Sequence, residues 1–140
     1  MILLDTSVLI DAFVHQNRVK QAQAKKCLEQ VIEQQTLLLS PLILTEFSFV
    51  LSKLNLFNAH QETIDFLQSF VNFEIDRKML IVSLQRASEL GTAKHINDLL
   101  HLAYAERFCK KLITFDKDFQ KFKHFTHFEI DILCSSETPS

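Results

Sequence analysis

Residues 2–11 of this chain read ILLDTSVLID, an apolar run that is followed at once by an acid and two hydroxyl residues. Such a run is typical of a buried parallel strand with Asp5 at its carboxyl tip. Thr6 or Ser7 can then cap a short helix that reaches Phe13. A strand that turns directly into a helix predicts one unit of an α/β fold.

The rest of the chain repeats this alternation. Ser40 and Pro41 suit a helix start, and Gly91, the only glycine, suits a helix end. Short strands between helices predict a three-layer α/β/α domain over residues 1–134, with a mostly parallel sheet of four or five strands and a polar, flexible tail over 135–140. Further strands are expected at 37–39, 73–75, 112–114 and 130–133, and further helices at 19–34, 41–53, 60–71, 77–90, 96–110 and 115–119.

Composition narrows the class of protein. The 140 residues suit one globular domain, with 47% hydrophobic and 23% charged residues. The net charge of -2 neither supports nor excludes a nucleic-acid partner. Three cysteines without C-x-x-C spacing indicate free thiols in a reducing cytosol. Because the N-terminus lacks a basic segment and Asp5 interrupts its apolar run, we expect a cytoplasmic protein without a signal peptide or membrane span.

One carboxylate lies where an apolar residue is expected. On the predicted helix over 41–53, the neighbours of Glu46 one turn away are all apolar: Leu42, Ile43, Phe49 and Val50. A charge on the core side of a helix must be paired or must coordinate a metal ion. A salt bridge is the alternative, but no lysine or arginine lies within one turn. The pattern favours a functional site.

Three further acids are placed to join Glu46. Asp5 and Asp116 follow strands, and strand ends meet at one edge of a parallel sheet. Asp98 lies in the first turn of its helix. Taken singly, the three could be a helix cap, an Asx-turn and a partner of the helix dipole. If all four acids converge, their repulsion demands a cation, and oxygen ligands favour Mg²⁺ or Mn²⁺ over Zn²⁺.

Four segments resemble PIN domains in their order and spacing, and more narrowly the VapC toxins of bacterial toxin–antitoxin pairs. The resemblance covers about the whole chain. It is most specific in the first and last segments. The segments are LLDTSVLID (3–11), SPLILTEFSFVL (40–51), INDLLHLAYAERF (96–108) and LITFDKDF (112–119).

The resemblance implies a PIN-like α/β/α fold and an Mg²⁺-dependent ribonuclease, with Mn²⁺ as a possible substitute. It also implies a homodimer and a cognate antitoxin protein. Glu46 would orient the attacking water or receive its proton, and the products would carry a 5′-phosphate and a 3′-hydroxyl. The implied catalytic and metal-holding residues are Asp5, Glu46, Asp98 and Asp116; the supporting residues are Thr6 beside the first acid, Thr114 two positions before the last, and Asp118 beside the last.

Basic residues follow the last acid of the predicted site. Lys117, Lys121 and Lys123 are candidates for contacts with RNA phosphates, although a solvated face is the favoured explanation. His101 is one helical turn from Asp98, where a satisfied structural histidine is the simpler interpretation.

Phenylalanines recur every three residues near the C-terminus, and core packing is the favoured explanation over a partner-binding surface. The helix pair over 42–71, rich in Leu and Phe, could dimerise or clasp an antitoxin. The periodic residues are Phe119, Phe122, Phe125 and Phe128.

Three other functions remain open. A non-catalytic PIN-like module would bind RNA or protein without cutting, and an RNA-maturation nuclease would cut without an antitoxin. A haloacid-dehalogenase-like phosphatase also begins with an acid after a strand, but it needs a second Asp at position 7, where this chain has Ser.

Overall fold

The computed structural model describes residues 1–134, so the tail expected at 135–140 lies outside the described residues. Four parallel strands form one sheet in the order β2-β1-β3-β4. Their side chains are buried where strands meet, as in Leu3, which lies between Leu38 and Leu112. The mostly parallel sheet is therefore confirmed. The strands are β1 (Ile2–Leu4), β2 (Leu37–Leu38), β3 (Lys111–Thr114) and β4 (Glu129–Ile132).

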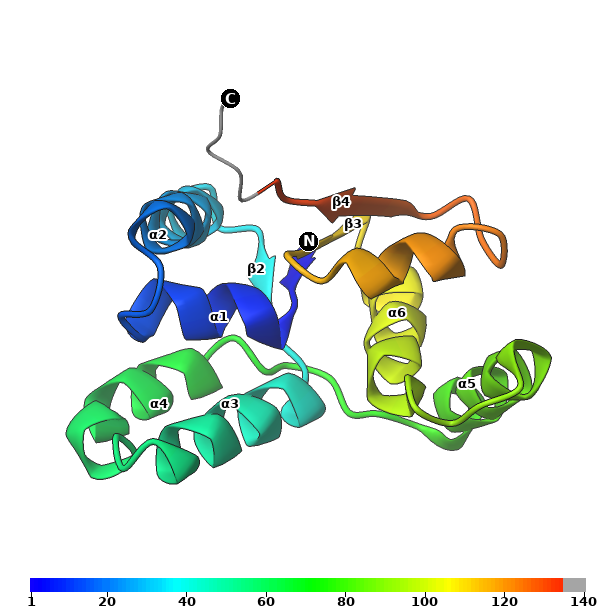
Figure 1. The fold of residues 1–140 in the computed structure, drawn as a ribbon, viewed down its shortest axis with the longest axis horizontal. Coiled ribbons are helices and arrows are strands. Elements are labelled where there is room, and N and C mark those ends of the chain that lie inside the picture. Colours follow the sequence, from blue (N-terminus) through cyan, green and yellow to red (C-terminus); the bar gives the residue numbers. More distant parts are fainter. Residues whose placement is uncertain (135–140) are drawn as a thin grey trace.

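Helices cover the strands on both sides. In Figure 1, α1 and α2 lie to one side of the strands, α6 and α5 lie to the other, and α3 and α4 form a pair below α1. The helices are α1 (Thr6–Phe13), α2 (Arg18–Glu33), α3 (Pro41–Lys53), η1 (Asn58–His60), α4 (Gln61–Gln68), α5 (Arg77–Leu90), α6 (Ile96–Phe108) and η2 (Lys117–Phe122).

Local capping signals set several helix ends. The Ser40 hydroxyl accepts a hydrogen bond from the Ile43 N–H, and Pro41 is the first helical residue, as predicted. Gly91 ends α5 with φ 76°, a left-handed conformation that glycine adopts without a Cβ clash. Because α3 begins directly after β2, its first turns lie at the carboxyl edge of the sheet.

The strand predicted at 73–75 is wrong. Within the described residues, the chain approaches the sheet there through an isolated bridge between Leu39 and Val71. Phe73 instead stacks on Phe108 with ring centroids 4.2 Å apart, and its carbonyl oxygen accepts a 2.7 Å hydrogen bond from Tyr104 Oη. The segment is thus held by side chains of α6 rather than by a neighbouring strand.

The periodic phenylalanines serve the core, as favoured from the sequence. Phe119 and Phe122 are fully buried, and Phe125 and Phe128 pack against the core while partly exposed. Within residues 1–134, none of the helices combines the length and the apolar character needed to cross a bilayer.

Candidate metal-dependent active site

Asp5 lies at the carboxyl end of β1, where the ladder with β3 continues for one more residue. Its N–H donates to the Ile113 carbonyl oxygen at 2.9 Å. The Asp5 Oδ2 atom accepts hydrogen bonds from Thr114 Oγ1 at 2.7 Å and from Ser7 Oγ at 3.0 Å. Asp5 is the N-cap residue of α1, as the cap alternative has it, but its side chain makes no capping bond, so capping does not account for the carboxylate. Two hydroxyls hold this buried carboxylate in place.

Glu46 reaches the same edge from α3. Its Oε1 atom accepts a hydrogen bond from Thr6 Oγ1 at 2.5 Å and lies 2.8 Å from His101 Nε2. Its Oε2 atom accepts a 2.9 Å bond from Asn97 Nδ2. Burial alone would raise the pKa of Glu46, but the bonds from His101, Thr6 and Asn97 hold it below its usual value. Glu46 is therefore ionised and paired, and its partner is a histidine rather than lysine or arginine.

Thr6 differs from its predicted role. The resemblance implied support for Asp5, yet the Thr6 hydroxyl donates to Glu46. Ser7 takes the position beside Asp5, and its Oγ also accepts the Phe115 N–H at 3.1 Å. The two adjacent hydroxyls thus serve two different acids.

Asp98 completes the group from the first turn of α6. Asp5, Asp98 and His101 each offer one ligand atom, and these atoms lie within 4.8 Å of one another. Burial and the negative charge of Asp5 raise the pKa of Asp98 from 3.8 to about 7, with further increases from Asp116 and Glu46. A helix-dipole partner would be stabilised in its charged form, so this shift favours a crowded site over that alternative.

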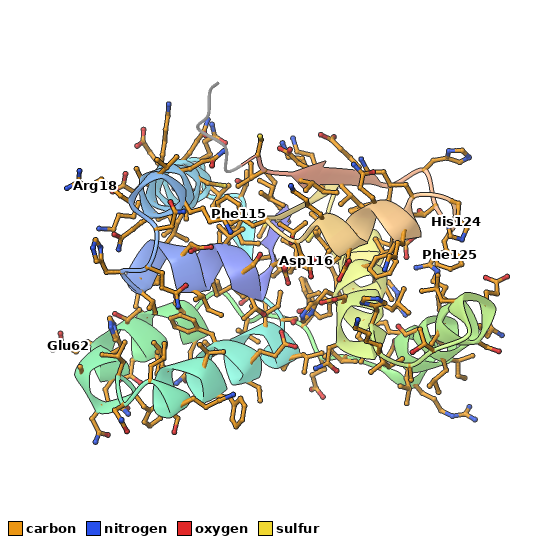
Figure 2. All side chains as sticks on the ribbon, viewed as in Figure 1. Arg18, Glu62, Phe115, Asp116, His124 and Phe125 are labelled. Carbon is orange, nitrogen blue, oxygen red and sulfur yellow. The ribbon has the colours of Figure 1, made fainter. Side chains whose placement is uncertain are left out.

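Asp116 is the fourth predicted acid, and it lies at the edge of the group. Its Oδ1 accepts the Asp118 N–H at 2.9 Å, so the Asx-turn exists as well. Its charge nevertheless raises the pKa of Asp98, which indicates that the two carboxylates are near each other. Figure 2 places Asp116 near the middle of the molecule, far from Glu62 and His124 at its two ends.

Asp118 and the predicted RNA-binding lysines lie outside this group of acids. Asp118 has a side chain that is 45% exposed; it lies 3.9 Å from His95 Nδ1 and 3.6 Å from Lys121 Nζ. Lys117 and Lys123 are exposed, as a solvated face requires. Thr114 does contact two predicted acids, since its hydroxyl donates to Asp5 and accepts the Asp116 N–H at 2.9 Å.

Reasoning from the sequence missed three polar residues of the site, namely Ser7, Asn97 and His101. His101 could have been found from the sequence, because it shares a helix face with Asp98. Its ring is 1% exposed, and its Nε2 lies 3.7 Å from Asp5 Oδ1. Burial opposes a charge on this ring, but the bond to Glu46 and the carboxylates of Asp5 and Asp98 raise its pKa overall.

The donor set fits a hard divalent cation. Carboxylate oxygens are the ligands that Mg²⁺ and Mn²⁺ prefer, and the raised pKa of Asp98 marks a crowding of like charges that a cation would relieve. Asp5 and Asp98 would hold such an ion, with Asp116 beside them. The presence of a histidine nitrogen in this group was not expected from the sequence.

Both the sequence and the fold are similar to those of known proteins. A model of the PIN domain family matches residues 2–124. No curated protein matched the sequence. One similar solved structure is that of VapBC2 from Rickettsia felis bound to a DNA fragment from its promoter. It is 19% identical in sequence and has a TM-score of 0.70, and the match covers 96% of this chain and 100% of that chain. A toxin–antitoxin complex from Klebsiella pneumoniae is 23% identical with a TM-score of 0.67, covering 99% and 100%.

Proposed function

Because this chain belongs to the PIN domain family, we propose that it is an Mg²⁺-dependent endoribonuclease, with Mn²⁺ as an alternative ion. One observation carries the proposal. Asp5 and Asp98, from β1 and α6, offer ligand atoms within a 4.8 Å group at the carboxyl edge of the sheet. Glu46 and Asp116 border that group and contribute to its charge. Four acids from distant segments would not be gathered there for stability alone.

The bound ion would offset negative charge on the scissile phosphate and lower the pKa of water at the site. Asp5, Asp98 and Asp116 would hold it. Glu46 is kept ionised by three donors and has a lowered pKa, so it is a weak base that suits orienting the attacking water by accepting its hydrogen bond. Thr114 and Ser7 fix the Asp5 carboxylate, which keeps the arrangement rigid during the reaction.

The reaction is hydrolysis of an RNA phosphodiester. A water oxygen forms a bond to phosphorus while the bond from phosphorus to the 3′ oxygen breaks. The water proton passes to solvent or to Glu46, and the leaving 3′ oxygen takes up a proton. The products carry a 5′-phosphate and a 3′-hydroxyl. Lys117, Lys121 and Lys123 offer positive charge for RNA phosphates near Asp116.

We further propose that the chain is the toxin of a VapBC-type pair, with a cognate antitoxin and a homodimeric state in the cytoplasm. The similar solved structures are toxin–antitoxin complexes. Exposed apolar side chains support protein partners: Phe49 on α3 is 63% exposed, Phe66 on α4 is 50% exposed, and Leu84 on α5 is 50% exposed. Cys27 and Cys109 are free thiols, which suits a reducing compartment.

The test incubates the purified protein with total RNA and with a mixed-sequence single-stranded oligonucleotide, in Mg²⁺, in Mn²⁺ and in EDTA. We expect cleavage with either ion and none with EDTA. Asp5→Asn and Asp98→Asn should abolish cleavage while the protein stays folded, and Glu62→Gln, an acid at the far end in Figure 2, should not alter it. If Asp5→Asn cuts as fast as the wild type, the nuclease assignment is wrong.

The toxin assignment has a separate test. A short reading frame beside this gene should encode a protein that co-purifies with the chain and suppresses its cleavage. If cleavage is present but no such partner exists, the chain is a nuclease of RNA maturation. If metal binds but no RNA is cut, it is a non-catalytic binding module.

A further inference from the structure

His101 is an almost fully buried polar residue of the site. It lies on α6 one turn after Asp98, with its ring 1% exposed. Its Nε2 atom lies 2.8 Å from Glu46 Oε1 and 3.7 Å from Asp5 Oδ1. The imidazole therefore stands between a carboxylate from α3 and one from β1, which are 41 positions apart in the chain.

The direction of the hydrogen bond excludes one role for this ring. A carboxylate only accepts hydrogen bonds, and Glu46 Oε1 lies 2.8 Å from His101 Nε2. The proton of the bond therefore belongs to His101 Nε2, which leaves no lone pair on that atom for a metal ion. While Nε2 donates to Glu46, His101 lies beside the ion-holding acids and does not offer that nitrogen as a ligand.

Glu46 depends on His101 more than on its other donors. Asn97 is exposed, so water can replace its hydrogen bond to Glu46. Thr6 donates from the start of α1 to the same Oε1 atom. Of the three donors, only His101 combines full burial with a second neighbouring carboxylate, so no solvent molecule can take its place.

The other nitrogen of the ring indicates that this residue is not kept for packing. Among residues 1–134, His101 Nδ1 is one of two buried side-chain nitrogen or oxygen atoms without a hydrogen-bond partner, and the other is Gln23 Oε1. A buried polar atom without a partner costs about 1–3 kcal/mol. An apolar side chain would avoid that cost, so the ring is better explained by what Nε2 does.

We propose that His101 is a positioning residue of the nuclease site: it acts through Glu46, holding that carboxylate turned toward Asp5 and Asp98. The inference rests on the function proposed above, because orienting Glu46 matters only if Glu46 orients water or an ion's hydration shell. If the inference is correct, substitution of His101 should lower cleavage and metal affinity in the same way as substitution of Glu46.

A double-mutant cycle tests this role. The four proteins are the wild type, His101→Leu, Glu46→Gln and the double variant. Two properties are measured: the single-turnover cleavage rate of the RNA oligonucleotide at saturating Mg²⁺, and the dissociation constant for Mn²⁺ by calorimetry. Loss of a residue that hydrogen-bonds to a side chain of a metal site typically lowers metal affinity or activity about 10–100-fold. We expect a loss of about that size in each single variant and no additional loss in the double variant.

The outcome that overturns the proposal is additivity. If His101→Leu lowers either property as much in the Glu46→Gln background as in the wild type, the ring does not act through Glu46. If the leucine variant fails to fold, His101→Asn replaces it, because the shorter amide cannot reach Glu46. His101→Gln, which can donate to Glu46, should stay closer to the wild type than either.

A second measurement separates positioning from ligation. A nitrogen ligand favours Ni²⁺ over Mn²⁺. If His101→Gln weakens Ni²⁺ binding much more than Mn²⁺ binding, His101 is a ligand and the proposal is wrong; equal effects support it. The matched control is His124→Gln, an exposed histidine far from Asp116 in Figure 2, which should behave as the wild type.

The two hypotheses fail in different ways. If the wild type does not cut RNA under any condition, the proposed function fails. The Mn²⁺ dissociation constants of the four proteins still test the positioning role. Additive losses in Mn²⁺ affinity would overturn it, and non-additive losses would support it.

Discussion

The hydroxyl of Thr114 donates a 2.7 Å hydrogen bond to Asp5 Oδ2, joining residues that are 109 positions apart. The same hydroxyl accepts the Asp116 N–H at 2.9 Å. Thr114 is fully buried, so water cannot replace either bond. One side chain at the end of β3 therefore sets the orientation of the first and last acids of the site.

Thr114→Val should weaken both stability and cleavage. Valine has nearly the same shape, but it removes one of the two hydroxyl donors to Asp5 and leaves the Asp116 N–H without its partner. The loss should cost about 1–3 kcal/mol in unfolding free energy. Because the Asp5 carboxylate loses a partner that fixes it, the cleavage rate should fall about 10–100-fold. Urea unfolding and single-turnover kinetics measure the two effects. Thr45→Val, on the exposed side of α3, is the control, and equal behaviour of the two variants would contradict the prediction.

The stability of the metal-free protein should depend on Asp98 between pH 4 and 7. The unfolded chain releases this proton near 3.8, whereas the folded site holds it to about 7. The favourable contribution of protonated Asp98 is therefore complete below pH 4 and is lost as the pH rises through about 7. Asp98→Asn lacks this loss, so its stability relative to the wild type should increase from pH 4 to pH 8 in EDTA.

Thermal unfolding across that pH range measures the difference. Glu62→Gln, far from the site, should run parallel to the wild type. A constant difference between Asp98→Asn and the wild type at every pH would show that Asp98 has an ordinary pKa.

Divalent ions should stabilise the folded protein. An ion that binds only the folded state adds about 2.7 kcal/mol at a concentration 100 times its dissociation constant. We expect Mg²⁺ and Mn²⁺ to raise the thermal midpoint of the wild type, and EDTA to reverse the shift. Asp5→Asn should lose most of the shift. An unchanged midpoint in the wild type with both ions would argue against a metal site.

The ion pair between Arg86 and Glu106 should serve stability and not chemistry. It joins α5 to α6 through two hydrogen bonds of 2.7 and 3.1 Å, with side chains 14% and 25% exposed. Arg86→Met should cost about 1 kcal/mol in unfolding free energy and leave cleavage per folded molecule unchanged. Arg107→Met, which breaks an exposed pair with Asp76, should have a smaller effect on stability.

Two lysines near Asp116 allow a test of RNA binding. If Lys117 and Lys123 touch phosphates, changing both to Gln should reduce the dependence of log affinity on log salt by about 0.7 for each phosphate that is no longer neutralised. Filter binding in Ca²⁺, over a range of KCl concentrations, measures the slope. Lys25→Gln with Lys26→Gln, an exposed pair on α2, is the matched control. If both double variants change the slope equally, the two C-terminal lysines have no special role in holding RNA.

Local physical chemistry made much of the fold predictable from the sequence. The apolar run before Asp5, the Ser40–Pro41 helix start and the left-handed Gly91 all act within one turn or one strand of their own position. The succession of strands and helices along the chain follows from these signals. So does the presence of acids at the carboxyl edge of a parallel sheet. For this reason the four acids stand out in the sequence alone.

Tertiary structure decided what each polar group contacts. The roles of Thr6 and Ser7 could not be separated from the sequence, because a rotation of one residue along α1 directs one hydroxyl to Glu46, 40 positions away, and the other to Asp5. The strand predicted at 73–75 failed because, within residues 1–134, no partner strand lies beside it. His101 acquired its role because α3 and α6 place Glu46 against its ring. Such contacts depend on how elements pack, and spacing within one helix does not contain that information.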